Sequence, residues 1–187
     1  MTIDEIFTTM GRKMVEGLMF HSQLCDFFCF LSLNGYSKCQ KYHYFEESCN
    51  YKKLGHYYLT HYGKIVLEEG FKNPKVIPEN WVNYTRADVN VQTRKNGVQT
   101  GFEKWVEWET DVKKTYESLY NELLKLGETA AAIEVKKYLK DVDDELAAAT
   151  QKWLELKATD WDLTMIIDEQ KEYEKKYSKK MKEVCLC

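Results

Sequence analysis

The chain has 187 residues, with 27 Lys and Arg against 30 Asp and Glu and a formal net charge of −3 at pH 7. A chain of this length forms one domain of ordinary size, and because charges of both signs are interspersed along it, we expect no nucleic-acid partner. No stretch reaches the roughly 18 apolar residues that span a bilayer, and the first residues are acidic and amphipathic, unlike a signal peptide, so we expect no membrane partner and a cytoplasmic location.

Two helices are predicted in the first part of the chain. Apolar residues recur at spacings of three and four along residues 6–31, which predicts a helix that ends at Asn34-Gly35, a pair typical of helix C-termini. The second helix is predicted over about residues 38–69 and closes at Gly70. Residues 71–101 contain both prolines of the chain and show no strong periodicity, so we expect a long connection there.

Three more helices are predicted after this connection. Residues 102–127 show the clearest helical pattern, with the carboxylate of Glu109 inside an otherwise apolar stripe. A fourth helix is predicted over residues 129–156, with Thr129 as its N-terminal cap. The last helix, residues 162–184, is amphipathic and highly charged, which suits a helix that lies on a surface or on a partner chain.

The order of these elements predicts the architecture. The chain order is that of an all-α four-helix bundle with one long crossover: helix, short turn, helix, long crossover, helix, short turn and helix. An additional C-terminal helix follows. We expect a single domain over residues 1–187, with the bundle in residues 1–157 and the extra helix in residues 162–184.

Three segments of the chain resemble helices of the ferritins. Residues 23–34 resemble the first ferritin helix, in which a ligand Glu is followed by Leu and then by an aromatic-Leu-Ser run. Residues 44–57 resemble the second helix, which ends in a Glu-x-x-His motif, and residues 105–126 resemble the third, with Glu109 at its ligand position. The resemblance implies a ferritin-like fold with one long crossover, and iron bound by carboxylates and imidazoles inside the bundle.

Carried over residue by residue, the resemblance places ligands at positions 23 and 53, at His56 and Glu109, and near Val142. Two of the required carboxylates are missing, because position 23 is Gln and position 53 is Lys. What remains is one histidine, one buried carboxylate and an acidic cluster on the fourth helix. The candidate metal ligands, with iron as the implied ion, are therefore His56, Glu109, Asp141, Asp144 and Glu145.

The same residues allow other interpretations. Lys53 or His56 could neutralise Glu109 as a buried pair that binds no metal, and the acidic cluster could be a solvated helix face. A different register would let His21 replace the ligand Glu of the first helix. Two further histidines are expected at the surface or at helix ends, namely His43 and His61.

We therefore expect a ferritin-like protein of the iron-binding or storage type with an incomplete ferroxidase centre. Efficient ferroxidase activity is not expected, because that reaction needs two bridged irons and the matching positions supply about half of the ligands. The alternative is a non-catalytic helical bundle for interaction or assembly that binds no metal.

Either protein is expected to form a homo-oligomer, because Phe20, Phe27 and Phe30 make the first helix apolar on more faces than one bundle covers. The terminal Cys185 and Cys187 could bind a soft metal, oxidise between chains or belong to a frayed tail.

Overall fold

The computed structural model describes residues 1–66 and 70–184, so the terminal cysteines lie outside the described residues. Within these ranges all regular structure is helical. The five α-helices are α1 (Ile3–Phe30), α2 (Asn34–Tyr62), α3 (Val91–Lys125), α4 (Thr129–Ala158) and α5 (Leu163–Val184). Two 3-10 turns, Glu79–Trp81 and Arg86–Asp88, lie between α2 and α3.

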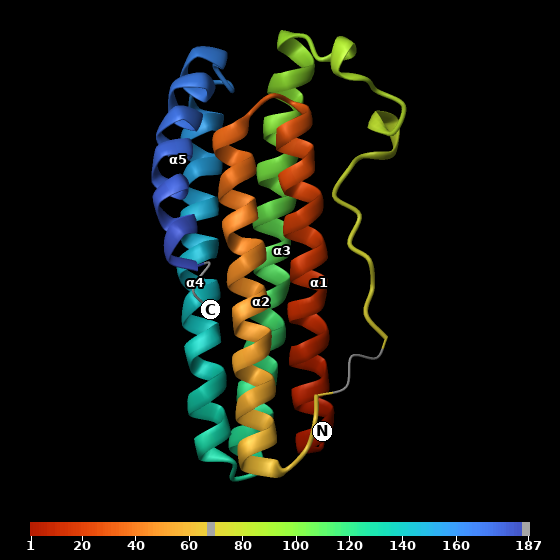
Figure 1. Cartoon of the computed structure of the whole chain (residues 1–187), viewed down its shortest axis with the longest axis vertical. Coiled ribbons are helices and arrows are strands. Elements are labelled where there is room, and N and C mark those ends of the chain that lie inside the picture. Colours follow the sequence, from red (N-terminus) through yellow and green to blue (C-terminus); the bar gives the residue numbers. More distant parts are fainter. Residues whose placement is uncertain (67–69, 185–187) are drawn as a thin grey trace.

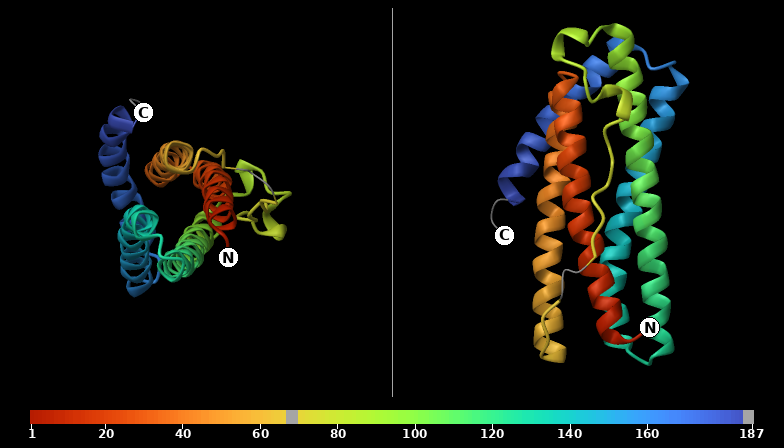
Figure 2. Two further views of the ribbon diagram at one scale, coloured as in Figure 1. Left: turned by 90° about the horizontal axis from the view of Figure 1, so that it is seen from below. Right: turned by 90° about the vertical axis from the view of Figure 1, so that its right-hand side faces the viewer.

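The first four helices form one elongated bundle, as predicted (Figure 1). α1 packs mainly on α2 and α3 mainly on α4, and each pair is antiparallel across a short turn. The connection from α2 to α3 runs the length of the bundle beside α1, so it is the predicted long crossover. α5 turns back at the far end and packs against α2, outside the bundle of four (Figure 2).

The prediction that Asn34-Gly35 ends the first helix was wrong, because these two residues begin α2. The turn is instead made by residues 31–33, where Ser32 takes a positive φ of 60° and Leu33 N–H donates to the carbonyl of Phe28. The second helix also stops earlier than the expected Gly70. Gly63 takes the left-handed conformation, with φ 65°, and its N–H caps the carbonyl of Leu59.

α3 begins at Val91, eleven residues before the predicted start at 102, and its cap is Asn90, whose side chain accepts from Thr93 N–H at 2.9 Å. Two glycines in this stretch serve close packing. A Cβ on Gly97 would lie 2.6 Å from Leu31, and one on Gly101 would lie 2.6 Å from Phe28. Small residues at these positions let α3 approach α1, so the glycines are inside the helix for a tertiary reason.

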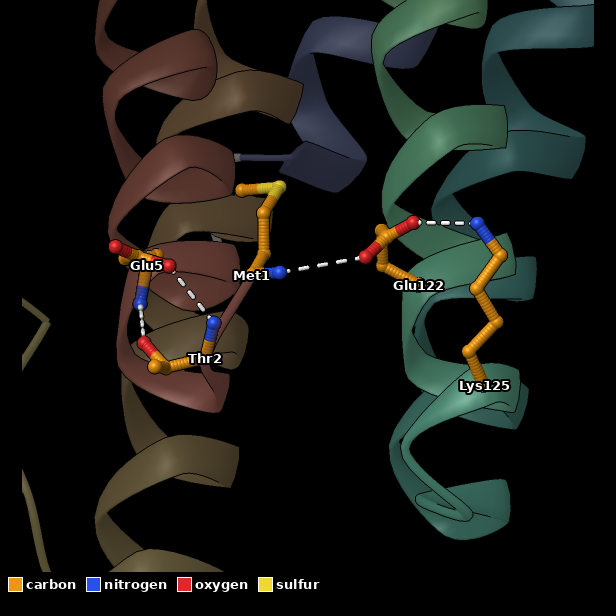
Figure 3. Close-up of polar contacts among 5 residues, drawn as sticks. All are labelled: Met1, Thr2, Glu5, Glu122 and Lys125. Atoms are coloured by element: carbon orange, nitrogen blue, oxygen red, sulfur yellow. Dashed lines mark hydrogen bonds and ion pairs between the residues drawn. The ribbon is translucent and has the colours of Figure 1, made fainter.

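The lower end of the bundle is tied by the N-terminus (Figure 3). Thr2 and Glu5 form a capping box, in which each side chain bonds to the other residue's backbone N–H. The terminal ammonium of Met1 lies 3.3 Å from Glu122 of α3, which also pairs with Lys125. These contacts join the start of α1 to the end of α3. At the start of α4, by contrast, the cap residue is Glu128 and not the expected Thr129.

The crossover covers the outer apolar face of α1. Phe27 meets Trp81 at a ring distance of 5.3 Å, and Gln23 bonds to both Asn73 and the backbone N–H of Val76. The apolar face that led us to expect an oligomer is therefore occupied largely by the chain itself. Among the described helices, none combines the length and apolar character needed to cross a membrane.

Two apolar clusters fill the bundle, one above the other. The upper cluster contains Tyr36 against Phe102, with ring centroids 5.2 Å apart, and the lower one contains Phe7 stacked on Tyr58 at 4.5 Å. Along α3, Trp105 belongs to the upper cluster and Val112 to the lower one. The level between them carries buried polar side chains, and these are His21, Gln40, His43 and Glu109.

Candidate metal centre

Two groups of potential metal ligands lie at this polar level. The first consists of His21, Glu109 and Glu145, and the second of His43, Glu46 and Glu145. Within each group the ligand atoms lie within 4.8 Å of one another. Each of the four bundle helices supplies at least one member, and Glu145 of α4 belongs to both groups.

His21 is held in one orientation by a neighbour on α2. Its Nδ1 lies 2.8 Å from Oε1 of Gln40, and an amide oxygen only accepts, so Nδ1 carries the proton. The lone pair of Nε2 then points toward Glu109, whose Oε1 is 3.7 Å away, and Nε2 has no hydrogen-bond partner among the described residues. Burial, and then the charge of the nearby His43, lower the pKa of His21 to about 4. His21 is therefore a neutral imidazole, and the lone pair of its Nε2 is not used in a hydrogen bond among the described residues. The neutral imidazole is the form that binds metals.

Glu109 is a carboxyl group buried in the core of the bundle. It is 2 % exposed, and its Oε1 accepts a hydrogen bond from the indole N–H of Trp105 at 3.1 Å. Burial raises the pKa of Glu109 well above its ordinary value, and the carboxylate of Glu145 raises it further. Without a cation nearby, this carboxyl group is costly to ionise.

The second group is a more strongly charged set. Nδ1 of His43 lies 3.2 Å from one oxygen of Glu46 and 3.2 Å from one oxygen of Glu145. Burial alone would lower the pKa of His43, but Glu145 and Cys39 together outweigh it and the pKa is raised well above its ordinary value. Burial likewise opposes ionisation of Glu145, yet His43 holds its pKa below the ordinary value. The hydroxyl of Tyr42 donates a hydrogen bond to Glu46 at 2.6 Å and so orients the Glu46 side chain, the third member of the group.

A further carboxyl group, Glu47, lies against the same level of the bundle. A Cβ on Gly17 of α1 would lie only 3.2 Å from the carboxyl carbon of Glu47. The absence of a side chain at Gly17 therefore makes room for Glu47. Burial and then the charge of Glu145 raise the pKa of Glu47 to about 8. Carboxyl groups with raised pKa values beside a charged pair mark this level as the electrostatically unusual part of the molecule.

Solved structures with the same arrangement of helices are ferritins. A structure described as a humanized archaeal ferritin matches at a TM-score of 0.76 with 17% identity, over 91% of this chain and 94% of that chain. An open-pore ferritin from the hyperthermophilic archaeon Archaeoglobus fulgidus matches at 0.71 with 16% identity, over 91% and 93% of the two chains. An engineered closed form of the Archaeoglobus fulgidus ferritin matches at 0.70 with 16% identity, over 93% and 96%.

The chain has a ferritin-like fold. At these identities the likeness concerns the fold alone, and it confirms the predicted all-α, ferritin-like bundle with an additional C-terminal helix. No protein-family model and no curated protein matches the sequence. What the ferritin-like bundle does must therefore be argued from its own residues.

The ferritin-like bundle separates the ligands that we predicted from the sequence. Glu109 and Glu145 lie together at the polar level of the core. His56, in contrast, is exposed and lines a cavity of about 460 Å³ between α2 and α4, and Asp141 and Lys53 line the same cavity. Asp144 is exposed and pairs with Lys140 at 2.9 Å. The predicted His56 and Glu109 are therefore not brought to one site, and Lys53 does not neutralise Glu109.

From the sequence we did not predict His43 and Glu46 as ligands, and we named His21 only as an alternative. Our expectation that His43 lies at the surface or at a helix end was wrong, since it is 6 % exposed in the middle of the bundle. One signal was available: His43 and Glu46 stand three residues apart, so they share a helix face, in the reverse order of the Glu-x-x-His motif. His61 is exposed in the last turn of α2, as expected.

Proposed function

We propose that this protein binds iron inside its ferritin-like bundle, with one ion in each ligand group and Glu145 shared between the two. The observation that carries the proposal is the position of Glu145 in both groups, each of which also holds one histidine and one further carboxylate. Di-iron bundles of this fold take carboxylates from all four helices and imidazoles from Glu-x-x-His motifs. Here the reversed pair of His43 and Glu46 would supply that contribution from α2, and His21 would replace a carboxylate on α1.

The state of the side chains supports a ligand role. Nε2 of His21 and Nε2 of His43 are buried and have no hydrogen-bond partner among the described residues. Such groups are costly in a folded protein unless something binds them. A divalent cation would use the lone pair of His21 and would also stabilise the ionised form of Glu109. The donor set of imidazole and carboxylate suits ferrous and ferric iron.

The proposal includes the physiological setting that we expected from the sequence. The protein would act as an iron-binding or storage-type subunit in the cytoplasm, with residues 1–187 as one domain. It would also form a homo-oligomer. Support for assembly comes from apolar side chains exposed on the crossover, such as Ile77 and Val82, which are 41 % and 69 % exposed. Gel filtration with light scattering tests the oligomer, and a monomer at all concentrations would contradict it.

Aerobic titration with ferrous iron tests the metal proposal, followed by gel filtration and metal analysis of the protein peak. Wild type should retain iron in both ligand groups and Glu145→Gln in neither, because Glu145 is the shared ligand. His56→Ala is the matched control, since it removes a histidine of α2 that lies in the exposed cavity and should leave iron retention unchanged. Equal retention by wild type and Glu145→Gln would contradict the site.

The competing function is the bundle for interaction or assembly that binds no metal. In that protein the charges of His43 and Glu145 would satisfy each other as a buried pair that favours one packing arrangement. It predicts that wild type elutes without iron and oxidises ferrous iron no faster than buffer. The titration above therefore separates the two functions in a single experiment.

A further inference from the structure

A cavity leads from the surface to the second ligand group. It has a volume of about 300 Å³ and lies where α5 approaches α2 and α4. His43 and Glu145 are in its lining, together with side chains of α5. The additional C-terminal helix therefore forms one wall of the space next to the candidate metal centre.

The inner end of this cavity holds a buried imidazole with one unpartnered nitrogen. His43 is 6 % exposed; its Nδ1 faces the carboxylates of Glu46 and Glu145 at 3.2 Å, whereas its Nε2 makes no hydrogen bond among the described residues. His43 lines the cavity, so a molecule or ion inside would reach it. A buried ring nitrogen without a hydrogen bond at the end of a cavity indicates a place where something binds.

The walls nearer the surface carry an excess of negative charge. Glu46, Asp141 and Asp144 line the cavity in addition to Glu145. Asp144 is paired with Lys140, but no basic side chain of the described residues lies within ion-pair distance of Asp141. Partial burial raises the pKa of Asp141, and Glu145 and Glu46 raise it further, as expected for carboxylates that repel one another. A wall of this kind attracts cations and repels anions.

α5 contributes positive charges to the same cavity. The ammonium of Lys180 lies 4.7 Å from the ring centroid of Tyr42 and 5.5 Å from that of Tyr177. Lys176 lies 5.2 Å from the ring of Tyr177. Lys180 lines the cavity together with Glu46, Asp141 and Glu145. The positive charge of Lys180 therefore offsets the negative potential of the cavity, which would otherwise attract a metal cation.

We propose that this cavity is the entrance through which a divalent cation reaches the metal centre, and that Lys180 on α5 is the positive charge that slows its passage. The proposal rests on the proposed function, because it needs a metal centre at the inner end. The carboxylates of Glu46 and Asp141 would guide the cation inward to His43 and Glu145. Lys180 would sit against the aromatic rings at rest and move aside, on its flexible stem, as a cation enters.

Stopped-flow loading with Co²⁺ tests the entrance, because imidazole and carboxylate ligands give Co²⁺ a visible absorption. Lys180→Gln should load faster than wild type, and Asp141→Asn slower, each by about threefold to tenfold at low salt. Both differences should shrink at high salt, since the effect is a screened charge. The matched controls remove the same charges from nearby exposed positions, with Lys182→Gln on α5 and Asp143→Asn on α4. Each control should load at the wild-type rate.

The possible results separate the entrance from the metal site. If wild type binds Co²⁺ but Lys180→Gln and Asp141→Asn load at the wild-type rate, the cation enters elsewhere and the entrance is contradicted. The same follows if Lys182→Gln accelerates loading as much as Lys180→Gln, because the effect is then one of net charge. If wild type binds no Co²⁺ at equilibrium, the metal site and its entrance are both contradicted.

Discussion

Oε1 of Gln40 on α2 lies 2.8 Å from Nδ1 of His21 on α1, and this contact fixes which nitrogen of the imidazole faces Glu109. Replacing Gln40 by Leu should lower the metal affinity by about 10-fold to 100-fold, the usual cost of losing a group that orients a ligand. Stability without metal should also fall, by about 1–3 kcal/mol, because the variant leaves the buried Nδ1–H of His21 without its acceptor.

Equilibrium titration with Co²⁺, beside urea denaturation of the metal-free protein, measures both effects of Gln40→Leu. Gln23→Leu is the matched control, since it removes an amide from α1 that holds the crossover and does not reach the centre. A Gln40→Leu protein that is destabilised but binds metal with unchanged affinity would show that the contact serves packing only.

The shared position of Glu145 predicts a pattern of stoichiometry. His21→Ala should remove one bound ion per chain and leave the group of His43, Glu46 and Glu145 loaded, and His43→Ala should do the converse. Glu145→Gln should remove both ions. Metal analysis after gel filtration gives the count. Loss of all metal in His21→Ala would mean that the two groups act as one site.

Metal should also stabilise the folded protein. A ligand that binds only the folded chain adds about 2.7 kcal/mol at a concentration of 100 times its Kd. Thermal unfolding with and without Co²⁺ should show a higher Tm for wild type and for His56→Ala, since His56 is exposed outside the centre. The shift should be absent in Glu145→Gln, and a full shift in that variant would place the bound metal elsewhere.

The docking of α5 depends on Gly35. A Cβ at this position would lie 1.7 Å from the backbone oxygen of Gln170, and the backbone N–H of Gly35 donates to the side chain of Gln170 at 2.9 Å. Gly35→Ala should therefore destabilise the protein by about 2–4 kcal/mol. At Gly55, in the same helix, an added Cβ would meet no atom of the described residues within 4 Å apart from the adjacent helix backbone, so Gly55→Ala should stabilise the protein by about 0.5–1 kcal/mol. Urea denaturation measures both, and similar values for the two variants would contradict the contact.

Glu169 should make the stability of the protein depend on pH. Burial raises its pKa above the ordinary 4.5, although Lys152 at 3.3 Å opposes the shift. The folded protein thus keeps a proton that the unfolded chain releases, so the contribution of Glu169 to stability falls as the pH rises from 4.5. Glu169→Gln should therefore become more stable relative to wild type as the pH rises from 4 to 7.

Denaturation curves of metal-free protein at the two pH values measure this gain. Glu172→Gln removes the same charge from an exposed position of α5 and serves as the matched control. A difference between Glu169→Gln and wild type that is the same at both pH values would rule out the buried carboxyl group as the cause.

Much of the fold could be predicted because helices leave a local pattern in the sequence. The spacing of apolar residues located all five helices, and the start of α5 agrees with the prediction. Glu109 was recognised as a carboxylate within an apolar stripe for the same reason, and it is buried as that pattern implies. The start of α3 was missed because residues 91–101 show no strong periodicity, and the place of Gly97 and Gly101 inside a helix becomes clear only when α1 is packed against them.

The candidate centre was harder to predict because it is made by side chains that only packing brings together. The face that each residue occupies on its own helix follows from a period of 3.6 residues. Which turn of α2 lies opposite His21 follows instead from the three-residue turn at 31–33 and the docking of α5 at Gly35. That register places His43 beside Glu145 and leaves His56 in the exposed cavity. The sequence of one helix does not determine its axial register relative to a neighbouring helix. The ligand groups are therefore set only by the packing of the bundle.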